Sequence, residues 1–65
     1  MIGDRIKYER RKAGMTQGEL AEKVGISRGA INKIENNKTK AIKYKTAREI
    51  ADALGISADF LFCLE

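Results

Sequence analysis

The chain has 65 residues, of which 43% are hydrophobic and 34% are charged, and its formal net charge at pH 7 is +4. A chain of this length can bury only about 60% of the surface it exposes when unfolded, so we expect one domain, residues 1–65, around one small core. It has no histidine and a single cysteine, Cys63, which excludes an intrachain disulfide and leaves no recognisable catalytic or metal-binding motif. No apolar run approaches the roughly 18 residues of a membrane span, and no segment resembles a signal peptide. We therefore expect a cytoplasmic protein that is not an enzyme, with no cofactor, no metal and no evident small-molecule ligand.

The first predicted helix covers residues 2–13 and ends at Gly14, a residue suited to the left-handed conformation after a helix. Basic residues fill its last turn, where their positive charge interacts favourably with the negative end of the helix dipole. Four positions lie near one face at helical spacing: Ile2, Ile6, Arg10 and Ala13.

Two further short helices are predicted within residues 16–36. Thr16 and Glu19 form a T-x-x-E capping box at the start of the first, and Gly25 ends it. Ser27 then caps the second helix. A connection of about three residues is too short for a relaxed hairpin but suits a helix-turn-helix corner. The apolar positions that would pack inside this corner are Leu20, Ala21, Val24, Ala30, Ile31 and Ile34.

The opposite face of the second of these helices is polar. Arg and Lys donate to the acceptors of guanine in the major groove, and Asn can pair with adenine. We therefore predict that this face reads DNA bases through Arg28, Asn32 and Lys33. Gly29 lies on the same face and has no side chain. It therefore allows close approach to a base pair, leaves one base pair unread, or is only a tolerated weak position that costs about 1 kcal/mol of helix propensity.

The charge is distributed unevenly along the chain. Residues 23–48 carry eight basic side chains against one acidic side chain, Glu35, whereas residues 49–65 carry four acidic side chains and no basic one. A concentration of positive charge on and just after the proposed reading helix is typical of a phosphate-binding surface.

The remaining sequence predicts two more helices and no strand. Asn37 can adopt a left-handed conformation after the third helix. A fourth helix has two candidate starts, one near Tyr44 and one at the later T-x-x-E box of Thr46 and Glu49. We favour the earlier start, because Tyr44 would otherwise be a large exposed aromatic residue. Gly55 ends the fourth helix and Ser57 caps a last one. This last helix runs through residue 64 and turns three apolar side chains inward: Phe60, Leu61 and Leu64. The fold class is therefore an all-α, compact five-helix orthogonal bundle.

The sequence resembles the phage repressor and Cro type of helix-turn-helix DNA-binding domain, an XRE-like family. The residues that carry the resemblance are Gln17, Leu20, Ala21, Val24, Gly25, Ile26, Ile31, Ile34, Glu35 and Asn36. The resemblance implies a lambda-repressor-like fold and a transcriptional regulator, a repressor, that binds an inverted-repeat operator on double-stranded DNA as a homodimer. The family often has a proline before the fourth helix, where this chain has Ala41 and Ile42, which leaves the path of residues 37–43 open.

The resemblance also implies roles for individual residues. It implies that Arg10 pairs with Glu35 and lies close to a phosphate. It also implies that Gln17, at the start of a helix, contacts a phosphate. The full set of predicted phosphate-binding residues is Arg10, Thr16, Gln17, Ser27, Asn36, Lys38, Lys40 and Lys43. The predicted dimer interface consists of Phe60, Phe62 and Cys63, which lie in the acidic C-terminal segment away from the basic residues.

A second interpretation is a protein-interaction module of the same fold, antitoxin-like or bound by an anti-repressor, with secondary DNA binding. The positive charge argues against this as the sole function, because the partner would have to be strongly acidic. The sequence does not predict the operator, the target gene or the direction of regulation. It also does not say whether the chain is complete or the N-terminal domain of a longer repressor.

Overall fold

The computed structural model describes residues 2–39 and 42–62. Five helices follow one another within these ranges, and no strand occurs there. The predicted all-α fold with five helices is therefore confirmed. The helices are α1 (Ile2–Lys12), α2 (Gln17–Val24), α3 (Arg28–Glu35), α4 (Tyr44–Leu54) and α5 (Ala58–Phe62).

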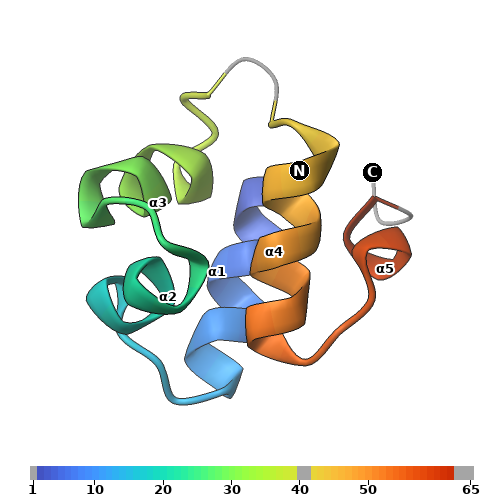
Figure 1. The fold of residues 1–65 in the computed structure, drawn as a ribbon, viewed down its shortest axis with the longest axis horizontal. Coiled ribbons are helices and arrows are strands. Elements are labelled where there is room, and N and C mark those ends of the chain that lie inside the picture. The colour runs from blue at the N-terminus through green and yellow to red at the C-terminus, as the bar shows by residue number, and fades with distance from the viewer. Residues whose placement is uncertain (1, 40–41, 63–65) are drawn as a thin grey trace.

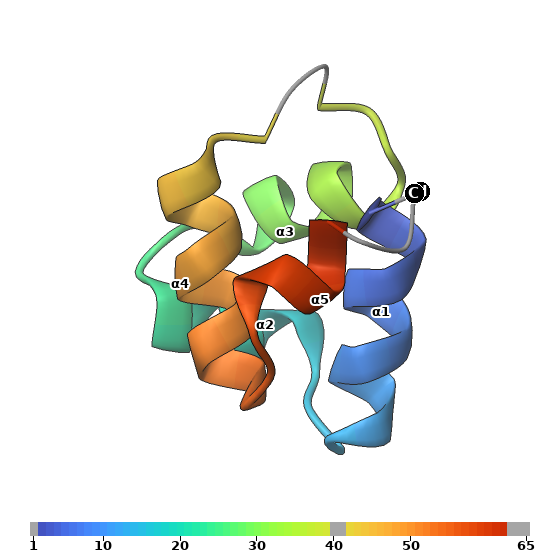
Figure 2. The same cartoon turned by 90° about the vertical axis from the view of Figure 1, so that its right-hand side faces the viewer.

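The helices cross one another around a common centre. α1 and α4 lie in the middle, with α2 and α3 on one side and α5 on the other (Figure 1). Seen after a 90° turn, α5 lies over the space between α1 and α4 and contacts both (Figure 2). The domain measures 25 × 23 × 19 Å, so no direction dominates its shape. None of the helices in the described ranges has the length and apolar character needed to cross a membrane.

Each of the five helices contributes at least one side chain to a single core. Burial of a large aliphatic side chain contributes about 1.5–3 kcal/mol, so these contacts provide most of the favourable energy of so small a domain. The buried apolar residues are Ile6, Leu20, Ala21, Ile31, Ile34, Ala47, Ile50, Ala51 and Leu61. Those predicted to pack inside the helix-turn-helix corner are buried or half-buried, as expected.

α1 and the C-terminal end of α3 approach each other closely at Gly3. A Cβ atom on Gly3 would overlap the carbonyl oxygen of Ile34, so only glycine fits there. The backbone N–H of Gly3 donates to Oδ1 of Asn37 at 3.1 Å. Asn37 has φ 58°, the left-handed conformation predicted for it, and its amide donates to Asp4 at 3.3 Å. The side chain of Asn37 therefore links the end of α3 to the first turn of α1.

Two predictions about aromatic residues were wrong. α4 does begin at Tyr44, but Tyr44 is 56% exposed, so packing of its ring is not the reason for that start. The N-cap is Lys43, which makes no side-chain capping bond, and Thr46 lies inside the helix. Phe60 was expected to point inward but is 41% exposed, because in this five-residue helix the buried position belongs to Leu61.

Other predictions differ in detail or lie outside the described residues. α1 ends at Lys12, and Ala13 is exposed in the turn that follows, because Gly14 already has positive φ and the chain turns one residue early. α5 ends at Phe62 in the described range. Lys40, Cys63 and Leu64 lie outside that range, and the side chain of Phe62 is not described.

Candidate nucleic-acid interface

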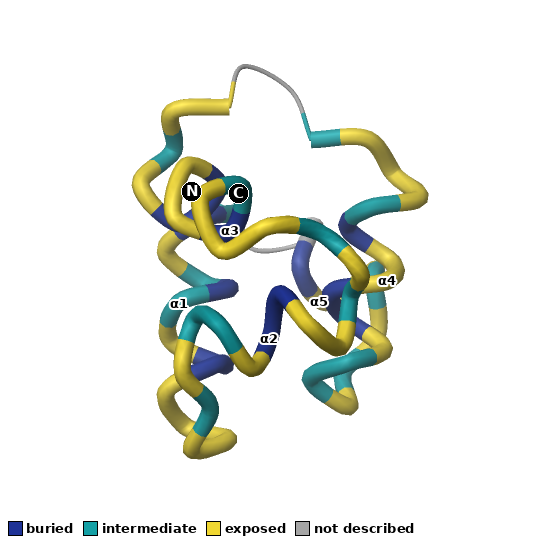
Figure 3. The backbone as a smooth tube through the Cα atoms, turned by 60° about the vertical axis from the view of Figure 1, so that its left-hand side comes forward, coloured by how far each residue is buried: buried dark blue, intermediate teal, exposed yellow. Residues whose placement is uncertain are grey.

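α3 has one buried and one exposed face. The exposed strip, shown in yellow in Figure 3, comprises all four predicted base-reading residues and the residue after the helix: Arg28, Gly29, Asn32, Lys33 and Asn36. Ile31, Ile34 and Glu35 lie on the buried face. Packing of the buried face against the core therefore holds the polar strip at the surface of the domain.

The N-termini of α2 and α3 are both capped by hydroxyl groups, as predicted. Thr16 accepts from the backbone N–H of Glu19 at 3.0 Å, and the Glu19 carboxylate accepts from the N–H of Thr16 at 2.8 Å. Ser27 accepts from the N–H of Ala30 at 3.1 Å. A hydroxyl that accepts in this way keeps its own hydrogen to donate. Both helix starts can therefore bind an anion such as a phosphate.

Beneath α3 lies a buried ion pair between Arg10 and Glu35, which confirms the pairing that the family resemblance implied. Arg10 Nε donates to Glu35 Oε2 at 2.6 Å, and Nη2 donates to Oε1 at 3.1 Å. The third nitrogen, Nη1, donates to the carbonyl of Met15 at 2.7 Å. Arg10 is 6% exposed and Glu35 2% exposed. All three nitrogens of Arg10 thus bond within the protein, and its phosphate contact stays a prediction.

Three carboxamides continue outward from this ion pair. Gln17 Nε2 donates to Glu35 Oε1 at 3.1 Å. Asn32 Nδ2 lies 3.5 Å from Gln17 Oε1, and Asn36 Nδ2 donates to Asn32 Oδ1 at 3.2 Å. We call Glu35, Gln17, Asn32 and Asn36 the amide chain. It connects the buried ion pair to a predicted base-reading side chain, a connection that the sequence did not reveal.

Four described basic residues on α3 or in the segment that follows it form no ion pair with other described residues. Within residues 2–39 and 42–62, no ion pair involves Arg28, Lys33, Lys38 or Lys43, and all four are exposed. Lys38 follows the end of α3, and Lys43 directly precedes α4. Cations that do not stabilise the fold through a partner remain available to an anionic ligand.

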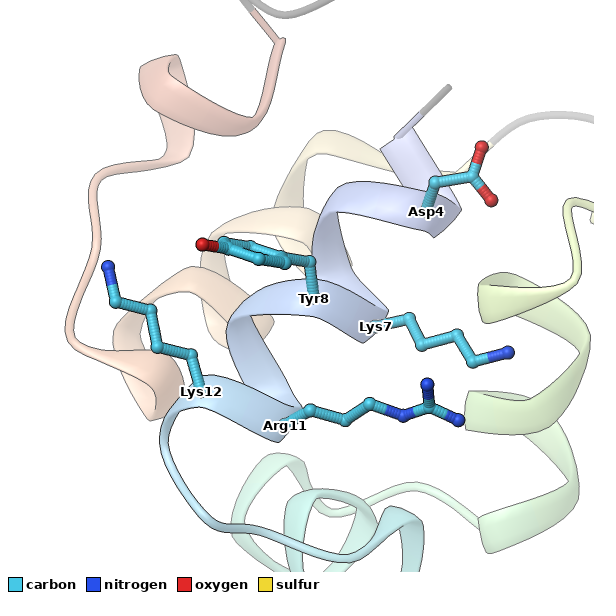
Figure 4. Close-up of a pocket in the computed structure, with 5 residues that line it drawn as sticks. All are labelled: Asp4, Lys7, Tyr8, Arg11 and Lys12. Carbon is cyan, nitrogen blue, oxygen red and sulfur yellow. The ribbon is translucent and has the colours of Figure 1, made fainter.

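Two more cations, Lys7 and Arg11, extend from α1 toward α3 (Figure 4). From the sequence, Arg11 was expected only to stabilise the end of the first helix through the helix dipole, and Lys7 had no predicted role. One signal was present in the sequence: the two residues are four positions apart, and like charges at this spacing destabilise a helix by about 0.2–0.5 kcal/mol. A pair of like charges that extends toward α3 at this cost is therefore a candidate for binding an anion.

The opposite side of α1 has a different character. Tyr8 points away from Lys7 and Arg11 (Figure 4) and is 57% exposed. The Arg5 guanidinium lies 5.5 Å from the centre of the Tyr8 ring and 4.8 Å from that of Phe60. Arg5 also pairs with Glu9 at 2.9 Å. We call Arg5, Tyr8 and Phe60 the aromatic side; among the predicted interface residues, only Phe60 has a described side chain.

Comparison with known proteins identifies a helix-turn-helix domain both from a family model and from curated relatives. A helix-turn-helix family model matches residues 6–61. The chain is 36% identical over 61 residues to YonR of Bacillus subtilis, an uncharacterized SPbeta prophage-derived HTH-type transcriptional regulator. The match covers 94% of this chain and 56% of YonR. The chain thus spans about half the length of the curated relatives it matches.

Two solved structures resemble the fold closely. One is SinR, a master regulator for biofilm formation, in complex with DNA: the TM-score is 0.90 at 32% identity, over 95% of this chain and 98% of that chain. The other is the P22 c2 repressor in complex with a synthetic operator: the TM-score is 0.84 at 31% identity, over 94% of this chain and 91% of that chain. The lambda-repressor-like architecture predicted from the sequence is therefore confirmed.

Proposed function

Because the chain belongs to the helix-turn-helix family, a DNA-binding and non-enzymatic family, we propose that it is a sequence-specific DNA-binding transcriptional regulator. α3 lies in the major groove, and the N-terminal half of the helix faces the base edges. The observation that carries this proposal is the exposed polar strip of α3. The buried apolar face of the same helix and the ion pair beneath it hold this strip at the surface. Arg28, Asn32 and Lys33 read bases.

The surroundings of α3 supply contacts to the DNA backbone. Capping hydroxyls of Thr16 and Ser27 donate to phosphates at the two helix starts, and Lys38 and Lys43 contribute charge beside the reading helix. Lys7 and Arg11 extend this surface along α1 (Figure 4). Contacts of this kind set the position of the protein on DNA without specifying a sequence.

The regulator binds as a homodimer in this proposal and acts as a repressor. One domain presents one reading helix, and two copies related by a two-fold axis would place their reading helices about 34 Å apart on one side of the duplex. The aromatic side lies away from Lys7 and Arg11 and supplies exposed apolar surface, including Phe60, for such a contact. The repressor role rests on the resemblance to the P22 c2 repressor.

Selection of bound duplexes from a random pool tests the proposal. We expect enrichment of an inverted repeat with half-site centres about 10 bp apart. A pool that stays random in sequence would contradict sequence-specific binding, and a single unrepeated half-site would contradict the homodimer. Sedimentation of the complex on the enriched duplex then gives the number of protein copies bound.

A further inference from the structure

The amide chain begins at a group that can only accept hydrogen bonds. The Glu35 carboxylate is held by two nitrogens of Arg10 and is 2% exposed. Carboxylate oxygens accept and do not donate. Any side chain that approaches Oε1 of Glu35 must therefore present a donor, and Gln17 does so with Nε2 at 3.1 Å.

This first contact orients the remaining carboxamides one after another. With Nε2 of Gln17 turned toward Glu35, the oxygen of Gln17 must face away from it, toward Asn32. That oxygen accepts only, so Asn32 presents its amide nitrogen there, at 3.5 Å. The oxygen of Asn32 is left to accept from Asn36 at 3.2 Å. The orientation of an Asn or Gln amide is ordinarily open to two choices, but here the carboxylate leaves one.

The same bonds leave Asn32 able to bind a base. A carboxamide has two N–H donors and two acceptor lone pairs, and Asn32 uses one of each within the protein. The remaining N–H and lone pair are the two that an adenine requires at N7 and at its N6 amine. Only one of the two orientations of a carboxamide complements a given adenine, since turning it over exchanges donor and acceptor.

From these contacts we infer that Gln17 is a positioning residue for the recognition of adenine by Asn32, and that Glu35 fixes the orientation of both side chains. The inference rests on the proposed function, because it requires α3 to read bases. It assigns Gln17 a role different from the phosphate contact that the resemblance implied. The side chain of Gln17 is half-buried and bonded at both ends, to Glu35 and to Asn32, within the protein.

The expected effect follows from the fraction of Asn32 side chains in the binding orientation. Without Gln17 the carboxamide can turn over, which halves that fraction, and the χ1 angle of the side chain regains a second staggered position, since the third clashes with the preceding turn of a helix. Apparent affinity falls in proportion to the competent fraction. Loss of the positioning contact should therefore weaken binding to the cognate site about two- to fourfold, with no loss on random DNA.

The test compares Gln17→Met with Lys38→Ala. Methionine has nearly the length of glutamine but neither of its polar ends, so Gln17→Met removes the positioning contact and leaves the Arg10–Glu35 pair. Affinity is measured for the selected duplex, for the same duplex changed at the base pair that Asn32→Ala affects, and for random DNA, each over a range of salt. Circular dichroism shows whether each variant is folded.

We expect Gln17→Met to lose about two- to fourfold in its preference for the wild-type base pair at that position, with an unchanged dependence of affinity on salt. Lys38→Ala should leave the base preference unchanged. It should lower the slope of log affinity against log salt concentration by about one. A lower salt slope for Gln17→Met would identify Gln17 as a phosphate ligand and overturn the inference. Unchanged preference in the folded variant, or unfolding of Gln17→Met, would leave Gln17 with a structural role only and overturn it as well. If the wild-type protein selects no sequence at all, the proposed function itself fails.

Discussion

The two faces of α3 differ in what their side chains contact. On the inner face, Ile31 is fully buried and Glu35 is bonded to two other side chains, Arg10 and Gln17. On the outer face, Arg28 and Lys33 are exposed and form no ion pair within residues 2–39 and 42–62. We infer that the fold depends on the inner face of α3 and that the proposed DNA binding depends on the outer face. Substitutions on the inner face should therefore change stability, and those on the outer face should change DNA binding alone.

The largest expected effect is that of Glu35→Ala on the inner face. This change leaves the Arg10 guanidinium buried without its partner, which costs about 3–5 kcal/mol. Small domains are stable by only about 5–15 kcal/mol in total, so urea denaturation should show a severely destabilised protein. The control is Arg10→Met combined with Glu35→Leu, which removes both charges and should recover most of the loss. A loss below about 1 kcal/mol in Glu35→Ala would contradict a structural role for the pair.

Gly3→Ala should have the next largest effect on stability. The added Cβ would overlap the carbonyl oxygen of Ile34, a backbone atom that cannot move without displacing α3 from α1. Overpacking of this kind costs about 1–3 kcal/mol. Gly18→Ala is the matched control, because a Cβ on Gly18 meets only the Thr16 hydroxyl oxygen, at 3.9 Å, and alanine favours a helix by about 0.5–1 kcal/mol. In thermal unfolding, Gly3→Ala should lower the midpoint temperature and Gly18→Ala should raise it. Equal shifts in the two variants would refute the close approach of α3 to Gly3.

On the outer face, Asn32→Ala should leave stability within about 0.5 kcal/mol of the wild type, as for most surface substitutions. It should cost about 1–3 kcal/mol in binding to the selected duplex and relax the preference at one base pair of each half-site. Competition binding against single-base variants of the duplex measures this. Equal losses on selected and random DNA would mean that Asn32 does not read sequence.

Substitution of the residues proposed to contact phosphates should have smaller effects still. Lys38→Ala should weaken binding to selected and random DNA alike and lower the salt slope by about one for the single contact removed. A salt titration of the wild type and the variant measures the change. Glu22→Ala, an exposed change in the middle of α2, provides the control in which no phosphate contact is lost. An unchanged slope would identify Lys38 as a solvated charge.

The sequence predicted those features that depend on neighbouring residues. The capping box of Thr16 and Glu19, the Ser27 cap and the left-handed Gly25 each involve positions within a few residues of one another. The polar strip of α3 follows from helical periodicity alone. Local rules of this kind determine where α2 and α3 begin and end, and thereby which side chains are exposed.

Features that depend on residues far apart in the sequence were mostly not predicted; the Arg10–Glu35 pair was expected only because the family resemblance implied it. Gly3 is required because α3 passes over it, more than thirty positions later in the chain. The amide chain joins Gln17 to Asn32, and nothing local to either residue indicates the contact. Tyr44 was expected to pack inward from the start of the fourth helix, but it is 56% exposed. Contacts and burial of this kind depend on how the helices are placed relative to one another, which local sequence patterns do not determine.

NMR titration of the folded protein with the selected duplex tests the claim that the outer face of α3 binds DNA. We expect the largest changes in backbone amide shifts at residues 27–38 and at the first turn of α2, with further changes at Lys7 and Arg11. The amides around Tyr8 and Phe60 should change only where a second protein copy contacts them, and not when a single half-site is used. Changes centred on Tyr8 and Phe60 with a single half-site, and none along α3, would contradict the claim.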